Sequence, residues 1–192
     1  MLKNSIGLMT VLALCACSGE KIEVSRIEKE TPEPAHVHGG MGAMPEGMID
    51  PGPAAKGLSW TLPAGWKEVR SGGIRLAKLT PPQEVGQAEA TVMALAGDAG
   101  GELANVNRWR GQIGLAPISQ SALAAERKLV RAPAGKVMVY DLIGEGTSKP
   151  RLIVGAVEVD GSTWYFKLMG DEKAVGQHKP GFLQLLGGLK KD

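Results

Sequence analysis

Apolar and polar residues alternate along several short stretches of the chain, which is typical of β-strands that bury one face. Such stretches cover residues 58–62, 74–79, 88–95, 137–143, 151–159 and 163–169. Turn residues separate them: residues 63–66 read Pro-Ala-Gly-Trp, and Asp160-Gly161 lies between two apolar runs. Asp-Gly in that setting predicts a β-hairpin. The chain is therefore predicted to be rich in strands, with residues 151–159 and 163–169 paired.

In the middle of the chain the period of the pattern changes to that of a helix. Apolar residues in the segment 102–115 are spaced three or four apart, and they are Leu103, Val106, Trp109 and Ile113. This spacing predicts an amphipathic helix of about four turns. A shorter helix is predicted after Ser119, because serine caps helix N-termini.

The C-terminal segment predicts a third helix, with Asp171 as its N-cap. Its apolar stripe contains Val175, Phe182, Leu185 or Leu186, and Leu189, with His178 on the same side. Pro180 lacks an N–H and its ring clashes with the carbonyl of Gly176, so we expect the helix to kink or restart there. Strands, two helices, more strands and a closing helix predict an α+β fold, an antiparallel sheet covered by helices, in one domain of residues 57–192.

The first sixteen residues have the pattern of an export signal. Lys3 precedes an apolar run over residues 6–16, which is too short to span a hydrocarbon core of about 30 Å. The run ends in Leu14-Cys15-Ala16-Cys17 and resembles a bacterial lipoprotein lipobox. The resemblance implies that a diacylglycerol is attached to Cys17 and that residues 1–16 are removed. Ser18 in the next position implies the outer membrane, with the inner membrane left open.

Residues 17–56 are predicted to be a flexible tether behind the lipidated cysteine. The segment has no aromatic residue, whereas all eight aromatic residues of the chain lie between Trp60 and Phe182. A chain without aromatic residues cannot bury enough apolar surface to offset the entropy lost on ordering.

The tether also contains an unusual concentration of soft metal ligands. Two of the three histidines and three of the eight methionines fall within thirteen residues, and they are His36, His38, Met41, Met44 and Met48. Thioethers suit Cu(I), and imidazoles accept either oxidation state of copper. The tract is similar to the His/Met tracts of periplasmic copper-handling proteins, which makes copper binding one interpretation and an inert linker the other.

Charge and residue usage exclude several other functions. Lysine and arginine number 22 against 20 acidic residues, so the mature chain is almost neutral and shows no nucleic-acid footprint. Both cysteines belong to the export region, which leaves no thiol chemistry for the domain. His178 is the only histidine of the domain and lies on an apolar stripe, so we expect a packed imidazole rather than a general base. No acid/base pair is recognisable, and we expect a protein that is not an enzyme and needs no cofactor, copper aside.

The most polar part of a regular element is residues 105–110, Asn-Val-Asn-Arg-Trp-Arg. At 100° per residue, Arg108 and Gln112 point away from the apolar stripe, while Arg110 points toward it. Arg108 and Gln112, with the flanking Asn105, are therefore candidate contacts for a partner, the alternative being a solvated helix face. Arg110 is expected to pack its stem and to pair with a carboxylate or with free carbonyl groups.

Several motifs together carry a family resemblance. They are residues 63–66, 74–77, 105–112 and 163–168 and the terminal Phe182-Leu183. They resemble a poorly characterised family of exported bacterial lipoproteins, and more loosely the strand order and closing helix are similar to the PsbP-like sandwich, named for a subunit that supports a larger assembly. The resemblance implies a non-enzymatic, lipid-anchored periplasmic module that binds an envelope protein; the alternative is a copper-handling lipoprotein.

Overall fold

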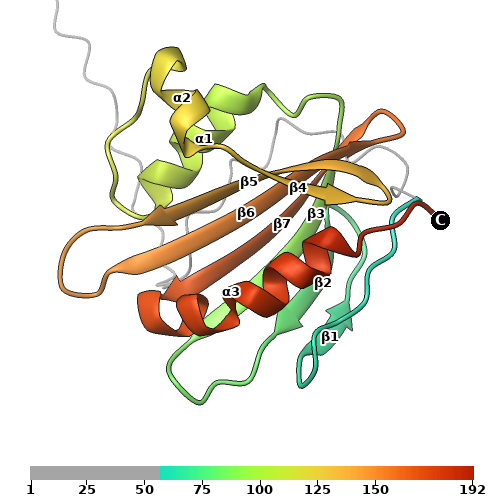
Figure 1. Cartoon of the computed structure of the whole chain (residues 1–192), viewed down its shortest axis with the longest axis horizontal. Coiled ribbons are helices and arrows are strands. Elements are labelled where there is room, and N and C mark those ends of the chain that lie inside the picture. The colour runs from blue at the N-terminus through green and yellow to red at the C-terminus, as the bar shows by residue number, and fades with distance from the viewer. Residues whose placement is uncertain (1–56) are drawn as a thin grey trace, which may run out of the picture. The chain divides into compact units, whose positions relative to one another are not determined.

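Residues 57–192, which the computed structural model describes, form one antiparallel sheet with three helices (Figure 1). The strands are β1 (Lys67–Arg70), β2 (Arg75–Thr80), β3 (Ala88–Ala96), β4 (Lys128–Ala132), β5 (Gly135–Ile143), β6 (Pro150–Val159) and β7 (Ser162–Asp171). The helices are α1 (Glu102–Gln112), α2 (Gln120–Glu126) and α3 (Glu172–Gly187). The sheet order is β1-β2-β3-β7-β6-β5-β4, with every neighbouring pair antiparallel. The predicted α+β fold, an antiparallel sheet covered by helices, is confirmed.

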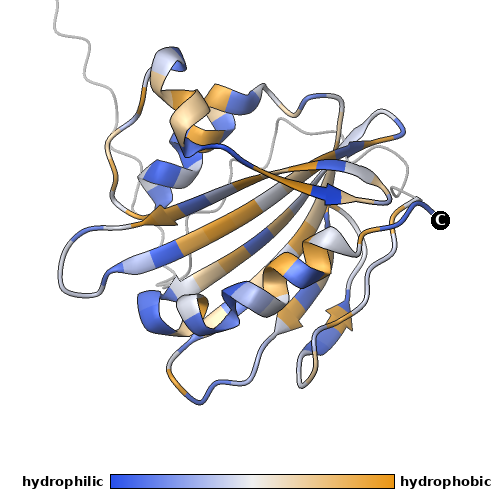
Figure 2. Ribbon diagram, viewed as in Figure 1, coloured by the Kyte–Doolittle hydropathy of each residue, from blue (hydrophilic) through white to orange (hydrophobic). Residues whose placement is uncertain are grey.

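Helix α3 covers one face of the sheet. Val175, Phe182 and Leu186 are fully buried against alternate residues of the central strands. Figure 2 shows the apolar stretches of β6 and β7 behind this helix. Strand alternation and helical spacing therefore meet in one core, as the sequence predicts.

Helices α1 and α2 build a second core on the opposite face (Figure 1). Val106, Trp109 and Ile113 of α1 and Leu123 of α2 are buried there. The ring of Trp109 lies 5.4 Å from that of Tyr140 on β5 and 5.6 Å from that of Tyr165 on β7, measured between centroids. The apolar phase predicted for α1 is confirmed.

The β6–β7 hairpin turns at Asp160-Gly161, as predicted. Both residues have positive φ, 49° and 78°, which a type I′ turn requires. The turn matches the right-handed twist of the strands and fixes their register. Tyr165 and Lys167 consequently lie on the same face of the sheet as α1.

One predicted strand and one predicted helix end are wrong. Residues 58–62 do not form a strand; Ser59 makes one bridge to Lys190, with N···O distances of 2.8 and 3.0 Å, because this segment pairs with the C-terminal tail instead of the sheet. Helix α1 ends at Gln112 and not at Leu115, because Gly114 adopts φ 77° and the backbone leaves the helical conformation there.

Strand β4 was not predicted from the sequence. It pairs with β5 through a turn at residues 133–134 and forms an edge of the sheet. Leu129 is 47% exposed and Val130 faces α3, so apolar residues occur on both faces and the alternation is obscured.

Of the kink or restart expected at Pro180, the restart does not occur, since α3 runs through the proline as one helix of 16 residues. Val175 before the proline and Phe182 after it are both fully buried on the same sheet face, and this packing holds the two halves in one helix. Asp171 occupies the predicted N-cap position, but its carboxylate accepts a hydrogen bond from the backbone N–H of Gln87 at 2.8 Å and does not cap its own helix.

Candidate functional site

Helix α1 lies along β7, held there by two polar contacts. The Asn105 side-chain amide donates to the Tyr165 hydroxyl at 3.1 Å, and the Lys167 ammonium donates to Gln112 Oε1 at 2.9 Å. Residues seven apart lie on the same side of a helix, two turns from one another. Arg108 lies between these contacts, three residues after Asn105, on the same side of α1.

Asn105 is a structural part of this arrangement. It is 4% exposed, and its amide nitrogen also donates to the carbonyl oxygens of Ala99 at 3.0 Å and Gly101 at 2.9 Å. Its Oδ1 accepts from Arg108 Nη1 at 2.5 Å. Asn105, proposed from the sequence as a flanking contact for a partner, is instead buried, because its amide closes the turn before α1, and it orients Arg108.

The two arginines of α1 have the different surroundings that the angular argument predicts. Arg108 and Gln112 are exposed. The Arg110 side chain is 15% exposed; its Nε donates to the Ala116 carbonyl at 2.7 Å and its Nη1 pairs with Glu126 at 3.1 Å. The inner, paired position predicted for Arg110 is confirmed.

Two further cations lie on the same side of α1. Lys167 is a half-buried residue of β7, and Arg75 is an exposed residue at the start of β2. Arg75 pairs in register with Met93 of β3, which pairs with Tyr165 of β7, so Arg75 faces the same side as Lys167. We call Arg75, Arg108 and Lys167, with Gln112 between them, the cationic surface.

Within residues 57–192, no carboxylate lies within 4 Å of any of these three cations. The charges act on one another: burial, followed by repulsion from Arg75 and Arg108, lowers the pKa of Lys167. Positive groups held together without a negative partner bind an anion favourably, and arginine adds bidentate geometry for carboxylate or phosphate. The cationic surface can therefore recognise an anionic group.

The opposite face contains a contrasting, satisfied ion cluster. Arg151 forms two hydrogen bonds of 2.8 Å with Asp141, and Lys179 of α3 adds a third at 2.7 Å. Burial by itself would raise the pKa of Asp141, but the hydrogen bonds from Arg151 and Lys179 outweigh it and lower the pKa. These charges neutralise each other and attach α3 to β5 and β6, which is a structural role.

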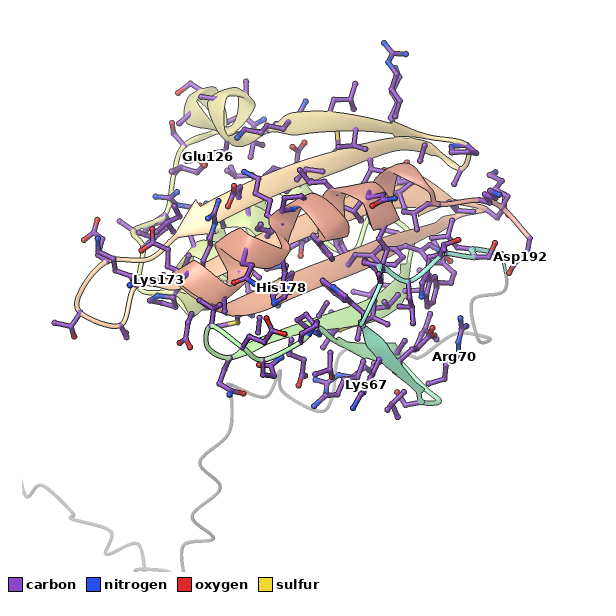
Figure 3. All side chains as sticks on the ribbon, turned by 60° about the horizontal axis from the view of Figure 1, so that its bottom comes forward. Lys67, Arg70, Glu126, Lys173, His178 and Asp192 are labelled. Carbon is purple, nitrogen blue, oxygen red and sulfur yellow. The ribbon has the colours of Figure 1, made fainter. Side chains whose placement is uncertain are left out.

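His178 has the packed environment predicted for it. Its Nε2 lies 2.8 Å from the Pro82 carbonyl oxygen, and its ring meets that of Trp66 edge-on at 5.9 Å. Figure 3 shows His178 on α3. The first contact holds the imidazole against the β2–β3 loop and the second against the segment before β1, and together they account for its place on the apolar stripe.

Several predicted features lie outside the described residues. These are the signal, the tether, the lipidated Cys17 and the copper ligands His36, His38, Met41, Met44 and Met48. From residue 57 onward, no group of three or more His, Cys, Asp or Glu side chains is arranged to hold a metal ion. Over the same residues, no helix has the length and apolar character needed to cross a membrane.

Arg75, Lys167 and Tyr165 were not identified from the sequence. Lys167 has a local signal, because burying a lysine in the middle of an apolar strand costs free energy, and such a residue is therefore a candidate for a functional role. Its neighbours could not be identified in the same way. They depend on β7 pairing with β3, two strands separated by more than sixty residues of sequence.

No protein-family model matches the sequence, and no curated protein matches it. Three solved structures are similar in fold. A Bacteroides thetaiotaomicron protein aligns with a TM-score of 0.43 and 9% identity over 70% of this chain, and this chain spans 45% of its length. LpqN, involved in cell envelope biogenesis of Mycobacterium tuberculosis, aligns with a TM-score of 0.45 and 10% identity over 72% of this chain and 85% of its own. The cyanobacterial PsbP (CyanoP) of Synechocystis aligns with a TM-score of 0.42 and 15% identity, over 73% of this chain and 96% of its own.

These likenesses concern the path of the chain alone. Membership of an exported lipoprotein family stays a prediction.

Proposed function

We propose that this protein is a lipid-anchored, non-enzymatic binding module of the bacterial envelope, and that it binds an acidic segment of a protein partner through the cationic surface. The observation that supports this most directly is the grouping of Arg75, Arg108 and Lys167 without a carboxylate partner in residues 57–192. The repulsion within such a grouping costs folding free energy, and this cost is offset when an anionic partner binds.

The export signal and the Leu-Cys-Ala-Cys motif support the envelope location. A domain attached through Cys17 by a tether of 39 residues is free to meet partners on the order of 35 Å from the membrane surface, from the scaling of flexible chains. The outer membrane is the proposed site of anchoring, from Ser18 after the cysteine. Replacing Cys17 with alanine should leave an unprocessed or soluble form, which intact-mass analysis of the membrane fraction detects; a mature chain that starts elsewhere than Cys17 contradicts lipidation.

The partner is best identified by its contact with the cationic surface. A photo-crosslinking amino acid at position 112 should capture one envelope protein in cells, and the purified pair should bind with an affinity that falls as salt rises. Arg75→Gln and Arg108→Gln should each weaken that binding by about three- to tenfold, the effect of removing one partly exposed charge.

Arg131→Gln is the matched control, because Arg131 is an exposed cation on the edge strand β4, three strands from β7 and five from β2. It should bind the partner as the unmodified protein does. If capture and affinity are unchanged in the Arg75 and Arg108 variants, or if affinity does not depend on salt, the cationic surface is not the binding site.

A second candidate function follows from the His/Met tract. Five soft ligands within thirteen residues favour copper capture by the tether. A peptide of residues 35–49 should form a one-ion adduct with Cu(I), and with Cu(II) more weakly as its imidazoles protonate below about pH 6.5. The same adduct after alanine replacement of all five ligands rules out this function.

A further inference from the structure

A pocket of about 400 Å³ opens between the N-terminal half of α1 and strands β5, β6 and β7. Its walls include Trp109, Tyr140 and Tyr165, which are 6%, 1% and 5% exposed. Small-molecule sites have this size and this combination of apolar walls with a few polar groups. Asn105 and Tyr165, whose hydrogen bond holds α1 beside the cationic surface, also line the pocket. The charged residues that line the pocket are not those of the cationic surface.

The negative charge of Glu102 is already neutralised. Arg127 binds both of its oxygens, at 2.7 and 2.5 Å, and the Tyr140 hydroxyl also donates to it. Burial, followed by the hydrogen bond to Glu102, raises the pKa of Tyr140. Tyr140 therefore stays a neutral aromatic wall, and Glu102 contributes little net charge to the pocket.

The remaining charge comes from the rim. Asp98 and Glu158 line the pocket as exposed carboxylates, and Lys136 is the only basic residue that lines it. Among residues 57–192 neither carboxylate lies in an ion pair. Both carboxylates act on Tyr165 in the pocket wall. Burial raises the pKa of Tyr165 most, the charges of Asp98 and Glu158 raise it further, and Arg108 opposes them. The pocket is thus aromatic inside and carries an excess of negative charge at its opening.

We infer that this pocket binds a small organic cation, an alkylammonium or quaternary ammonium group. Aromatic rings attract such cations through their π-electrons, and the contact is strongest where water is excluded. The two rim carboxylates add Coulomb attraction without competing for the apolar part of the ligand. This site is distinct from the proposed partner surface in the charge that it selects, because the partner surface selects for negative charge.

Calorimetric titration of the full chain, purified in detergent, tests the inference with two probes of equal shape. Choline is the cation, and 3,3-dimethyl-1-butanol is its neutral isostere. Choline should bind about tenfold more tightly, the order of selectivity that aromatic and carboxylate contacts supply. Equal affinity for the two probes, or no binding of choline at millimolar concentration, overturns the inference.

Charge variants locate the site. Asp98→Asn and Glu158→Gln should each weaken choline binding by about two- to fivefold, and Lys136→Gln should strengthen it by a similar factor, as single screened charges do. Glu145→Gln is the control, because Glu145 is an exposed acid in the β5–β6 loop and does not line the pocket. A control that weakens binding as much as Glu158→Gln shows a nonspecific charge effect and also overturns the inference. Arg75→Gln changes the cationic surface, and Arg75 does not line the pocket, so this variant distinguishes a failure of the cationic surface from a failure of the pocket.

Discussion

Replacing Lys167 with methionine should stabilise the domain. The ammonium is half-buried, has Gln112 as its hydrogen-bond acceptor, and is repelled by Arg75 and Arg108. Methionine has a similar volume and keeps the packing of the aliphatic stem. Gln112 is exposed, so water replaces the ammonium as its partner at little cost.

Burial of the ammonium is the larger cause of its lowered pKa, and the part that salt can screen follows from Coulomb's law and the strand register. Arg75 lies two strands from β7, about 10 Å at the usual spacing of about 4.8 Å per strand. At about 8–10 Å and an effective dielectric constant of about 40–80, each like-charge pair costs roughly 0.4–1 kcal/mol. Two pairs, screened by physiological salt, leave a gain of about 0.5–1 kcal/mol for Lys167→Met. For a domain of this size that raises Tm by about 2–4 °C.

Salt and pH separate this explanation from simple packing. The gain in Tm should shrink as NaCl screens the repulsion. Because the folded-state pKa of Lys167 lies below its unfolded value of about 10.4, the unfolded chain binds more protons between the two, and the stability of the unmodified protein rises with pH there. The advantage of the variant is therefore full below the folded pKa and is lost above about pH 10.4.

Thermal melts of the unmodified protein, Lys167→Met and the control Lys128→Met test this reasoning. Lys128 is an exposed residue of edge strand β4, and its replacement should change Tm little. A lower Tm for Lys167→Met at low salt, or a gain that is the same at every salt concentration, refutes the electrostatic account. Reduced binding of an acidic partner by the same, more stable variant would show that function retains the charge at the expense of stability.

Three other changes test the structure through unfolding measurements. Arg110→Ala should cost about 1–3 kcal/mol because it removes a packed stem and leaves a half-buried partner, whereas Arg108→Ala should cost less than about 0.5 kcal/mol; the reverse order in thermal melts means that the phase of α1 is wrong. Asp141→Asn should cost about 2–3 kcal/mol at pH 7, and since the Asp141 pKa is lowered, this difference should be present above about pH 4 and disappear as pH falls through the folded pKa; an unchanged acid limb in urea titrations counts against the ion cluster. Gly170→Ala places a Cβ 2.0 Å from the Gln87 carbonyl oxygen and should cost more than about 2 kcal/mol, whereas Gly111→Ala, in open space on α1, should gain about 0.5–1 kcal/mol; equal effects contradict the close approach at β7.

Local patterns were enough to predict the features that depend on neighbours in sequence. The Asp160-Gly161 hairpin was predicted because an I′ turn needs residues that accept positive φ. The division between Arg108 and Arg110 was predicted because 100° per residue fixes the phase of a helix.

The features that were missed depend on distant contacts. Strand β4 has Leu129 exposed, which no local pattern explains, and it is defined by its pairing with β5. Asn105 flanks the predicted contacts Arg108 and Gln112 in the sequence, but the turn before α1 and Tyr165 on β7 bury it. The meeting of Arg75 with Lys167 requires the β3–β7 pairing and a register shift after Arg75, neither of which leaves a trace in adjacent residues.

Asn105 separates two regions of opposite charge, and this has a thermodynamic consequence. Its oxygen accepts from Arg108 on the cationic surface, while its nitrogen donates to Tyr165, a wall of the pocket. An anion that draws Arg108 away changes the hydrogen bonding of an amide that also fixes a pocket wall. We therefore expect occupancy of one region to change the affinity of the other, and by reciprocity each of the proposed ligands would alter the free energy of binding of the other by the same amount.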